Sequence, residues 1–196
     1  GSGWYHGQTT GPYWGGSYYN QNFSNFTYEA RVWRGSDSDY DSNAIVIRAD
    51  PTPGSDYNWY AYYSFQITRG GSYSVYVRVA GISTALQAWT SSSAIATGDA
   101  WNVLKVTANG SQLYFYINGT LVWSGNNTSL TTGKVGFKYY VTSGTGHFYV
   151  DYAKLDVLSG SEPPPSDKIS EEQLLLNEEA RRGPIRGDER MVYPLP

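Results

Sequence analysis

Three segments of the chain carry aromatic and hydrogen-bonding side chains at alternate positions, a spacing that could hold a ligand. Residues 59–68 read Trp-Tyr-Ala-Tyr-Tyr-Ser-Phe-Gln-Ile-Thr, and residues 26–34 and 73–79 alternate in the same way. Successive side chains of a β-strand point to opposite faces, so one set of alternate positions predicts an apolar core face. The other set predicts a second face, shared by all three strands, that carries Trp33, Tyr60, Tyr62, Tyr76, Glu29, Arg31, Gln66 and Arg78.

This second face has the chemistry of a sugar-binding surface. The C–H face of a pyranose stacks on Tyr or Trp rings, and its hydroxyl groups need directional donors and acceptors. A polysaccharide or glycan surface is therefore the partner that we predict. Tyr, Trp and Thr also favour strands in the absence of any ligand, so an ordinary solvated sheet face is the alternative.

The sequence holds few groups for hydrolytic catalysis. A retaining glycosidase needs two carboxyl groups about 5–5.5 Å apart, but Glu29 is the only glutamate in residues 1–160, and no second carboxylate alternates with it along its strand. We expect Asp151 to hydrogen-bond to backbone rather than to react, and His6 and His147 lack the setting of a catalytic triad. We therefore predict that the protein is not an enzyme and has no catalytic residues.

The sequence also predicts no metal ion and no cofactor. Asp37, Asp39 and Asp41 alternate in one segment and could offer oxygens to Ca²⁺, but the Gly and Glu of a helix-loop-helix calcium site are missing there. A solvated loop is the expectation for this segment. The chain has no cysteine, which excludes disulfides and thiolate metal ligands.

Short alternating segments separated by Gly, Asn, Ser and Asp predict an all-β fold for residues 1–160. The Asn-Gly pairs at 109–110 and 118–119 are strong hairpin signals. We expect an antiparallel jelly-roll β-sandwich. The predicted strands are 26–34, 43–49, 59–68, 73–79, 85–90, 103–107, 113–117, 121–123, 135–141 and 148–157. The predicted buried residues are Phe65, Val75, Val77, Leu104, Val106, Leu113, Phe115 and Ile117.

The distribution of charge excludes two classes of partner. Residues 1–160 balance nine basic against nine acidic side chains, and residues 161–196 supply the whole net charge of −3. Because residues 1–160 carry no net charge, they lack the excess of positive charge with which proteins bind nucleic acid or anionic lipid. Apolar runs long enough to span a membrane are absent from the sequence.

Residues 161–196 differ in composition and predict a second region. Three prolines at 163–165 form a stiff spacer, residues 169–182 predict a helix, and an extended apolar end follows. We expect this tail to pack on its own domain or on a neighbouring copy, which would give a homo-oligomer. Its predicted interaction residues are Leu174, Leu175, Leu176, Val192, Tyr193 and Leu195.

Several blocks of the sequence resemble those of one superfamily. The blocks are Phe-Ser-Asn-Phe-Thr-Tyr-Glu-Ala-Arg at 23–31, Ala-Ile-Val-Ile-Arg-Ala at 44–49, residues 89–110, Leu-Tyr-Phe-Tyr-Ile-Asn-Gly-Thr-Leu-Val at 113–122, Gly-Lys-Val-Gly-Phe at 133–137 and Val-Asp-Tyr at 150–152. Over residues 14–158 the chain resembles concanavalin A-like lectin/glucanase domains, in particular the laminin-G-like, carbohydrate-binding and 3-keto-disaccharide hydrolase types. The resemblance implies the sandwich fold and leaves function open, since the superfamily includes lectins, glycosidases and structural modules. The usual opening strand is not obvious in residues 1–16.

Sequons for N-glycosylation suggest a location outside the cell. They begin at Asn22, Asn25, Asn109, Asn118, Asn126 and Asn127. Together these features predict an extracellular, secreted or cell-surface, non-catalytic carbohydrate-binding or adhesive module. The alternative is a structural subunit of an extracellular assembly that is connected through the tail.

Overall fold

The alternating segments form strands, and the strands form two antiparallel sheets. The structure, a computed structural model, describes residues 5–36 and 38–158. In chain order the strands are β1 (Tyr5–Thr10), β2 (Tyr13–Phe23), β3 (Phe26–Gly35), β4 (Ser42–Pro53), β5 (Trp59–Thr68), β6 (Ser72–Val79), β7 (Ile82–Ser91), β8 (Trp101–Asn109), β9 (Gln112–Ile117), β10 (Thr120–Asn126), β11 (Gly133–Val141) and β12 (Thr145–Val157).

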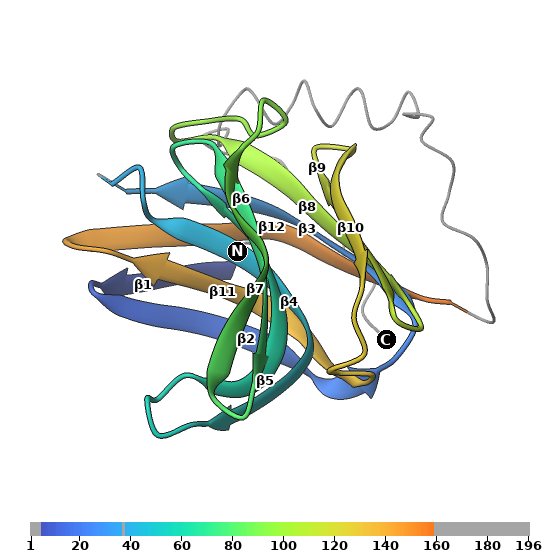
Figure 1. The fold of residues 1–196 in the computed structure, drawn as a ribbon. Coiled ribbons are helices and arrows are strands. Elements are labelled where there is room, and N and C mark those ends of the chain that lie inside the picture. The colour runs from blue at the N-terminus through green and yellow to red at the C-terminus, as the bar shows by residue number, and fades with distance from the viewer. Residues whose placement is uncertain (1–4, 37, 159–196) are drawn as a thin grey trace.

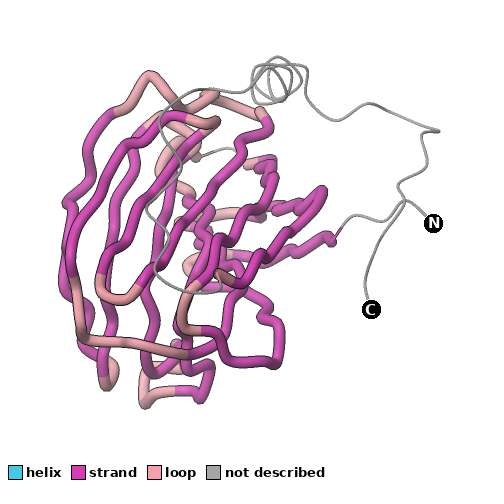
Figure 2. The backbone as a smooth tube through the Cα atoms, turned by 90° about the vertical axis from the view of Figure 1, so that its right-hand side faces the viewer, coloured by secondary structure: helices cyan, strands magenta, loops and turns pink. Residues whose placement is uncertain are grey.

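The two sheets lie as two layers (Figures 1 and 2). Sheet A has the strand order β1-β12-β3-β8-β9-β10, and sheet B has the order β2-β11-β4-β5-β6-β7. Residues 5–36 and 38–158 contain no helix, and therefore no helix that could cross a membrane. The predicted all-β, jelly-roll-like sandwich is confirmed.

The core lies between the sheets. Rings from the two sheets meet there, as Phe65 of β5 and Phe115 of β9 do with ring centroids 5.3 Å apart. All eight residues predicted to be buried are buried. Burial of these apolar side chains is the main favourable contribution to the fold.

The sequence did not reveal the first two strands, β1 and β2. Most of their residues are exposed, so they show no apolar alternation. They nevertheless complete the sheets, since β1 pairs with β12 in sheet A and β2 pairs with β11 in sheet B. Their glycines make room for Tyr139, because a Cβ added at Gly7 or at Gly15 would overlap atoms of its ring.

The Asn-Gly hairpins form where the sequence predicts them. Asn118 and Gly119 join β9 to β10 with φ of 49° and 80°, the left-handed values that a type I′ turn needs. Gly110, with φ of 55°, lies between β8 and β9. These turns set the register of the β8-β9-β10 meander.

Arg48 of β4 ties three loops together at one end of the sandwich. Its side chain is buried, and its guanidinium donates hydrogen bonds to the carbonyl oxygens of Ser24 (2.6 Å), Gly110 (2.7 Å) and Leu130 (3.0 Å). These three residues follow β2, β8 and β10 respectively. One side chain thus provides the donors that these carbonyl groups need.

We expect Arg48→Met to lower the free energy of unfolding by about 3–5 kcal/mol, because it leaves several buried carbonyl oxygens unpaired. Urea denaturation followed by circular dichroism measures this loss. The control is Arg69→Met, which removes a surface pair with Asp39 and Asp99 and should cost about 0–1 kcal/mol. Equal losses in the two variants would contradict the role of Arg48.

The predicted spacer, helix and extended end of residues 161–196 lie outside the described residues. The same holds for the six predicted interaction residues, Leu174, Leu175, Leu176, Val192, Tyr193 and Leu195. Packing of the tail on its own domain or on a neighbour therefore stays a prediction.

Candidate functional site

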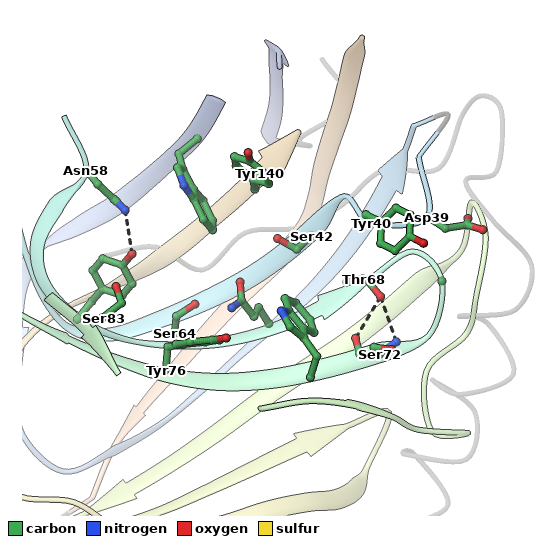
Figure 3. Close-up of a pocket in the computed structure, with 15 residues that line it drawn as sticks. Asp39, Tyr40, Ser42, Asn58, Ser64, Thr68, Ser72, Tyr76, Ser83 and Tyr140 are labelled. Atoms are coloured by element: carbon green, nitrogen blue, oxygen red, sulfur yellow. Dashed lines mark hydrogen bonds between the residues drawn. The ribbon is translucent and has the colours of Figure 1, made fainter. Parts of the chain in front are cut away.

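The outer face of sheet B carries a hollow of about 850 Å³, which we call the trough (Figure 3). Each strand of sheet B contributes to it, and so do the loops at its ends. The residues that line it are Trp14, Asp39, Tyr40, Ser42, Asn58, Tyr62, Ser64, Gln66, Thr68, Gly70, Ser72, Tyr76, Ser83, Trp89 and Tyr140.

The alternation along β5 places side chains on the trough floor. Tyr63, Phe65 and Ile67 belong to the core cluster, and the residues between them point the other way. Both sets are buried, and the buried stretch runs without a break from residue 61 to residue 68. The polar residues on the trough side, Ser64 and Gln66, thus form a floor below the surface.

Two buried atoms at the floor, one on the lining residue Gln66 and one on its neighbour Ser74, lack a hydrogen-bond partner among the described residues. They are Gln66 Oε1 and Ser74 Oγ, and both are buried. Gln66 and Ser74 are direct register partners on β5 and β6, so their side chains lie next to each other on one face. Of the two residues, Gln66 lines the trough, so a ligand hydroxyl group there could donate a hydrogen bond to Gln66 Oε1.

Two tryptophans stand on opposite sides of the floor. Trp14 comes from β2 and Trp89 from β7, the two edge strands of sheet B. They are 40% and 44% exposed, so both rings are accessible to a ligand. The tyrosines of the lining add further aromatic surface between them.

A buried lysine, Lys138 of β11, lies beside the Trp14 side of the trough. Its Nζ lies over the rings of Tyr62, Trp14 and Trp59, at 4.4, 4.7 and 5.2 Å from their centroids. It donates hydrogen bonds to Asn58 Oδ1 and, at 3.4 Å, to the Tyr62 hydroxyl. Asn58 Nδ2 donates to the same hydroxyl at 3.2 Å (Figure 3).

The surroundings of Lys138 lower the pKa of its amine to about 7. Burial is the largest cause, because it disfavours the charged form. The positive charge of Arg78 lowers this pKa further, and the negative charge of Asp56 opposes the shift. The amine is therefore partly neutral near pH 7, which is unusual for lysine.

Arg78 holds the loop that precedes β5. Its guanidinium donates hydrogen bonds to the carbonyl oxygen of Trp59 at 2.8 Å and to Asp56 at 2.6 Å. This loop carries Asn58. Arg78 thereby helps to fix the position of Asn58 against Tyr62.

The structure divides the eight predicted ligand residues between the two sheets. Tyr62, Gln66 and Tyr76 line the trough. Tyr60 is exposed outside the lining, and Arg78 is buried in the interactions described above.

The three predicted residues of β3, Glu29, Arg31 and Trp33, lie in sheet A. The prediction that all eight residues share one face was therefore wrong. Glu29 accepts a hydrogen bond from the Tyr152 hydroxyl at 2.7 Å, and Arg31 pairs with Asp151, also at 2.7 Å. The ring of Trp33 contacts that of Tyr149. Alternation gives the face of a strand but not the sheet to which the strand belongs, and β3 pairs with β8 and β12.

The sequence-based prediction missed several residues of the site. Lys138 and Tyr140 alternate with Val135, Phe137 and Tyr139 in a predicted strand, so their outward position could have been found. Trp89 also lies in a predicted strand. Trp14 could not have been found in this way, because β2 has no apolar alternation.

The acidic loop is engaged in interactions within the fold. Asp39 pairs with Arg69, and the buried Asp41 accepts hydrogen bonds from the backbone and side chain of Thr142. Asp37 lies outside the described residues. The described residues contain no group of three or more His, Asp or Glu side chains that could hold a metal ion.

Comparisons with known proteins support the fold and the family. The family model described as "3-keto-alpha-glucoside-1,2-lyase-like domain" matches residues 2–154. No curated protein matches the chain.

Solved structures with a similar fold include carbohydrate-binding and hydrolytic proteins. The carbohydrate binding module CBM66 from Bacillus subtilis has a TM-score of 0.57 at 18% identity, over 79% of this chain and 96% of its own. A Bacillus licheniformis beta-glucanase has a TM-score of 0.54 at 10% identity, over 71% and 69%. A prokaryotic lichenase derived from a mouse hindgut metagenome has a TM-score of 0.56 at 9% identity, over 72% and 70%. At these identities the likeness shows the fold alone.

These findings confirm one expectation from the sequence and overturn another. The resemblance to concanavalin A-like domains of the 3-keto-disaccharide hydrolase type is confirmed. The expectation that the protein is not an enzyme is corrected, because the matching family is described by a lyase activity. A pair of carboxylates is a requirement of glycoside hydrolysis, whereas an elimination needs only a base.

The lowered pKa of Lys138 predicts a pH-dependent stability. The unfolded amine has an ordinary pKa of 10.5, so between pH 7 and 10.5 the unfolded chain binds more protons at this site than the folded one. Stability should therefore rise with pH in this window, by at most about 1.4 kcal/mol per pH unit. We expect Lys138→Met to remove this rise, as measured by urea denaturation from pH 7 to 9.5.

Lys154→Met is the matched control, because Lys154 is exposed and should leave the slope unchanged. If the free energy of unfolding changed equally with pH in the wild type and in Lys138→Met, this would contradict a buried, partly neutral amine at Lys138.

Proposed function

Because the chain belongs to the family of 3-keto-alpha-glucoside-1,2-lyase-like domains, we propose that the trough binds a saccharide and that the protein acts on it as an enzyme. The observation that carries this proposal is the composition of the trough. Among the residues that line it, Asp39 alone is charged, and the others are aromatic rings, hydroxyl groups, amides and a glycine. Such a lining suits a neutral, hydroxyl-rich ligand.

Each part of the trough has a function in this proposal. The rings of Trp14 and Trp89 offer stacking surfaces for the C–H faces of sugar units. The hydroxyl and amide groups of the floor orient the ligand, since the unpartnered Gln66 Oε1 can accept a hydrogen bond from it and the serine hydroxyl groups can donate or accept.

The reaction that the family description suggests is an elimination. In a 3-keto glucoside the C2 hydrogen is acidic because it is adjacent to the C3 ketone. A 1,2-lyase removes this hydrogen and expels the oxygen at C1, which requires a single base near C2.

Glycoside hydrolysis is the second candidate reaction, and the trough favours it less. Hydrolysis by a carboxylate pair requires two acidic side chains on either side of the bond. Asp39 is the one carboxylate in the trough lining, and it forms an ion pair with Arg69. The elimination is therefore the reaction that we propose.

We also propose that the protein acts outside the cell, as the sequons suggest. Of the six, Asn22 and Asn126 have exposed side chains. Asn118 Nδ2 instead donates hydrogen bonds to Ala94 and Asn102, so a glycan at Asn118 would break the turn. A structural role in an extracellular assembly depends on the tail and stays a prediction.

Calorimetric titration with α- and β-linked glucose disaccharides and their 3-keto derivatives tests the proposal. We expect binding to the wild type and a loss of about 1–2 kcal/mol, or roughly tenfold in affinity, for Trp14→Ala and for Trp89→Ala, because each removes a stacking surface.

The matched control is Trp33→Ala, which removes a tryptophan from sheet A and should leave the affinity unchanged. A ligand whose affinity depends on Trp33 but not on Trp14 or Trp89 would place the binding site elsewhere. Absence of binding across the whole series would contradict the proposed function.

A further inference from the structure

Tyr62 connects the trough to the buried amine of Lys138. Its ring lines the trough, and its hydroxyl lies within hydrogen-bond distance of Lys138 Nζ, at 3.4 Å, and of Asn58 Nδ2, at 3.2 Å. Asn58 Oδ1 accepts a hydrogen bond from the same amine. The three side chains form a closed cluster at one end of the trough.

The hydrogen bonds of this cluster limit the directions in which the phenolic hydrogen of Tyr62 can point. Asn58 Nδ2 can only donate, so it occupies a lone pair of the Tyr62 oxygen. The phenolic hydrogen remains free to point either to a neutral Lys138 amine or to a ligand in the trough. A protonated Lys138 has no lone pair and cannot accept it.

We propose that Tyr62 is a catalytic residue that takes the C2 proton of a 3-keto glucoside, and that Lys138 is the positioning residue that receives the phenolic proton of Tyr62 in return. This inference rests on the proposed function. The inference adds to the proposed function the identity of the base and the route that the proton takes.

The step balances with water as the only reactant besides the substrate. The C2–H bond breaks and its proton forms a bond to the Tyr62 oxygen, while the original phenolic proton moves to Lys138 Nζ. The electron pair of the C2–H bond forms the C1=C2 double bond, the C1–O bond breaks, and the departing oxygen takes a proton from water. The formal oxidation of C2 is balanced by the formal reduction of C1, so the step needs no oxidant or reductant.

The electrostatics of the cluster fit these roles. Burial raises the pKa of Tyr62, so a free phenolate is disfavoured and the proton must be passed on at once. The pKa of Lys138, lowered to about 7, supplies a neutral acceptor. The charged groups that act on Lys138 are Arg78 and Asp56, and Arg78 also acts on Tyr62.

The burial of Lys138 supports an indirect role. The residue is only 2% exposed, and three aromatic rings surround its amine. It therefore reaches a substrate through Tyr62 and not by direct contact. A desolvated lysine beside another cation is a recognised way to obtain a neutral amine at neutral pH.

Three variants test the relay with p-nitrophenyl 3-keto-α-glucoside as the probe. We expect Tyr62→Phe, which removes one hydroxyl, to lower kcat by about a hundredfold or more and to change the affinity for the probe by a few fold at most. Lys138→Met should lower kcat similarly and abolish the inflection near pH 7 in the pH profile of kcat. Tyr60→Phe, the same change at an exposed position outside the trough lining, is the control and should match the wild type.

Lys138→Arg separates a relay from a structural cation. Arginine keeps the positive charge and the contacts with the rings, but it is always protonated and cannot accept a proton. We expect this variant to remain folded, as judged by circular dichroism, to bind the probe and to stay inactive.

The outcomes distinguish this inference from the proposed function. Wild-type turnover in Tyr62→Phe or in Lys138→Arg would overturn the relay and leave saccharide binding intact. Binding of the probe by the wild type without any p-nitrophenol release would also overturn it. Failure of the wild type to bind any saccharide would overturn the proposed function, and the relay with it.

Discussion

The alternation of side chains along the central strands of sheet B is the constraint on which the rest of the structure depends. Inward residues of β4, β5 and β6 pack against sheet A, and outward residues of the same strands, among them Ser42, Gln66 and Tyr76, line the trough. A slip of one residue in register would exchange the two sets, bringing polar side chains into the core. Core packing therefore fixes which residues face the trough, and the Phe65–Phe115 contact serves the site as well as the fold.

The core and the two faces of each strand could be predicted from the sequence, but the sheet to which each strand belongs could not. The period of two identified Tyr62, Gln66 and Tyr76 correctly as residues of a polar face, because alternation is a local property. Pairing is not local, and so Glu29, Arg31 and Trp33 were assigned to a face that belongs to the other sheet. Exposed edge strands have the weakest alternation of apolar and polar residues, and for this reason β2 and its Trp14 were not predicted.

The chemistry of the site was the least accessible to sequence reasoning. A search for two carboxylates addresses one way to break a glycosidic bond, and it led to a non-catalytic prediction that the family corrects. The properties of Lys138 arise from residues far apart in the sequence, since Trp14, Asn58 and Tyr62 meet at its amine only in the folded chain. Burial then changes an ordinary surface base into a group that titrates near neutrality.

The most direct measurement of the central claim, that the trough of sheet B is the saccharide site, is a titration followed by the indole N–H resonances in a ¹⁵N-edited NMR spectrum. Trp14 and Trp89 belong to the trough lining, whereas Trp33 and Trp101 belong to strands of sheet A. The account predicts that a 3-keto disaccharide shifts the resonances of Trp14 and Trp89 and leaves those of Trp33 and Trp101 in place. Shifts confined to Trp33 and Trp101 would contradict it.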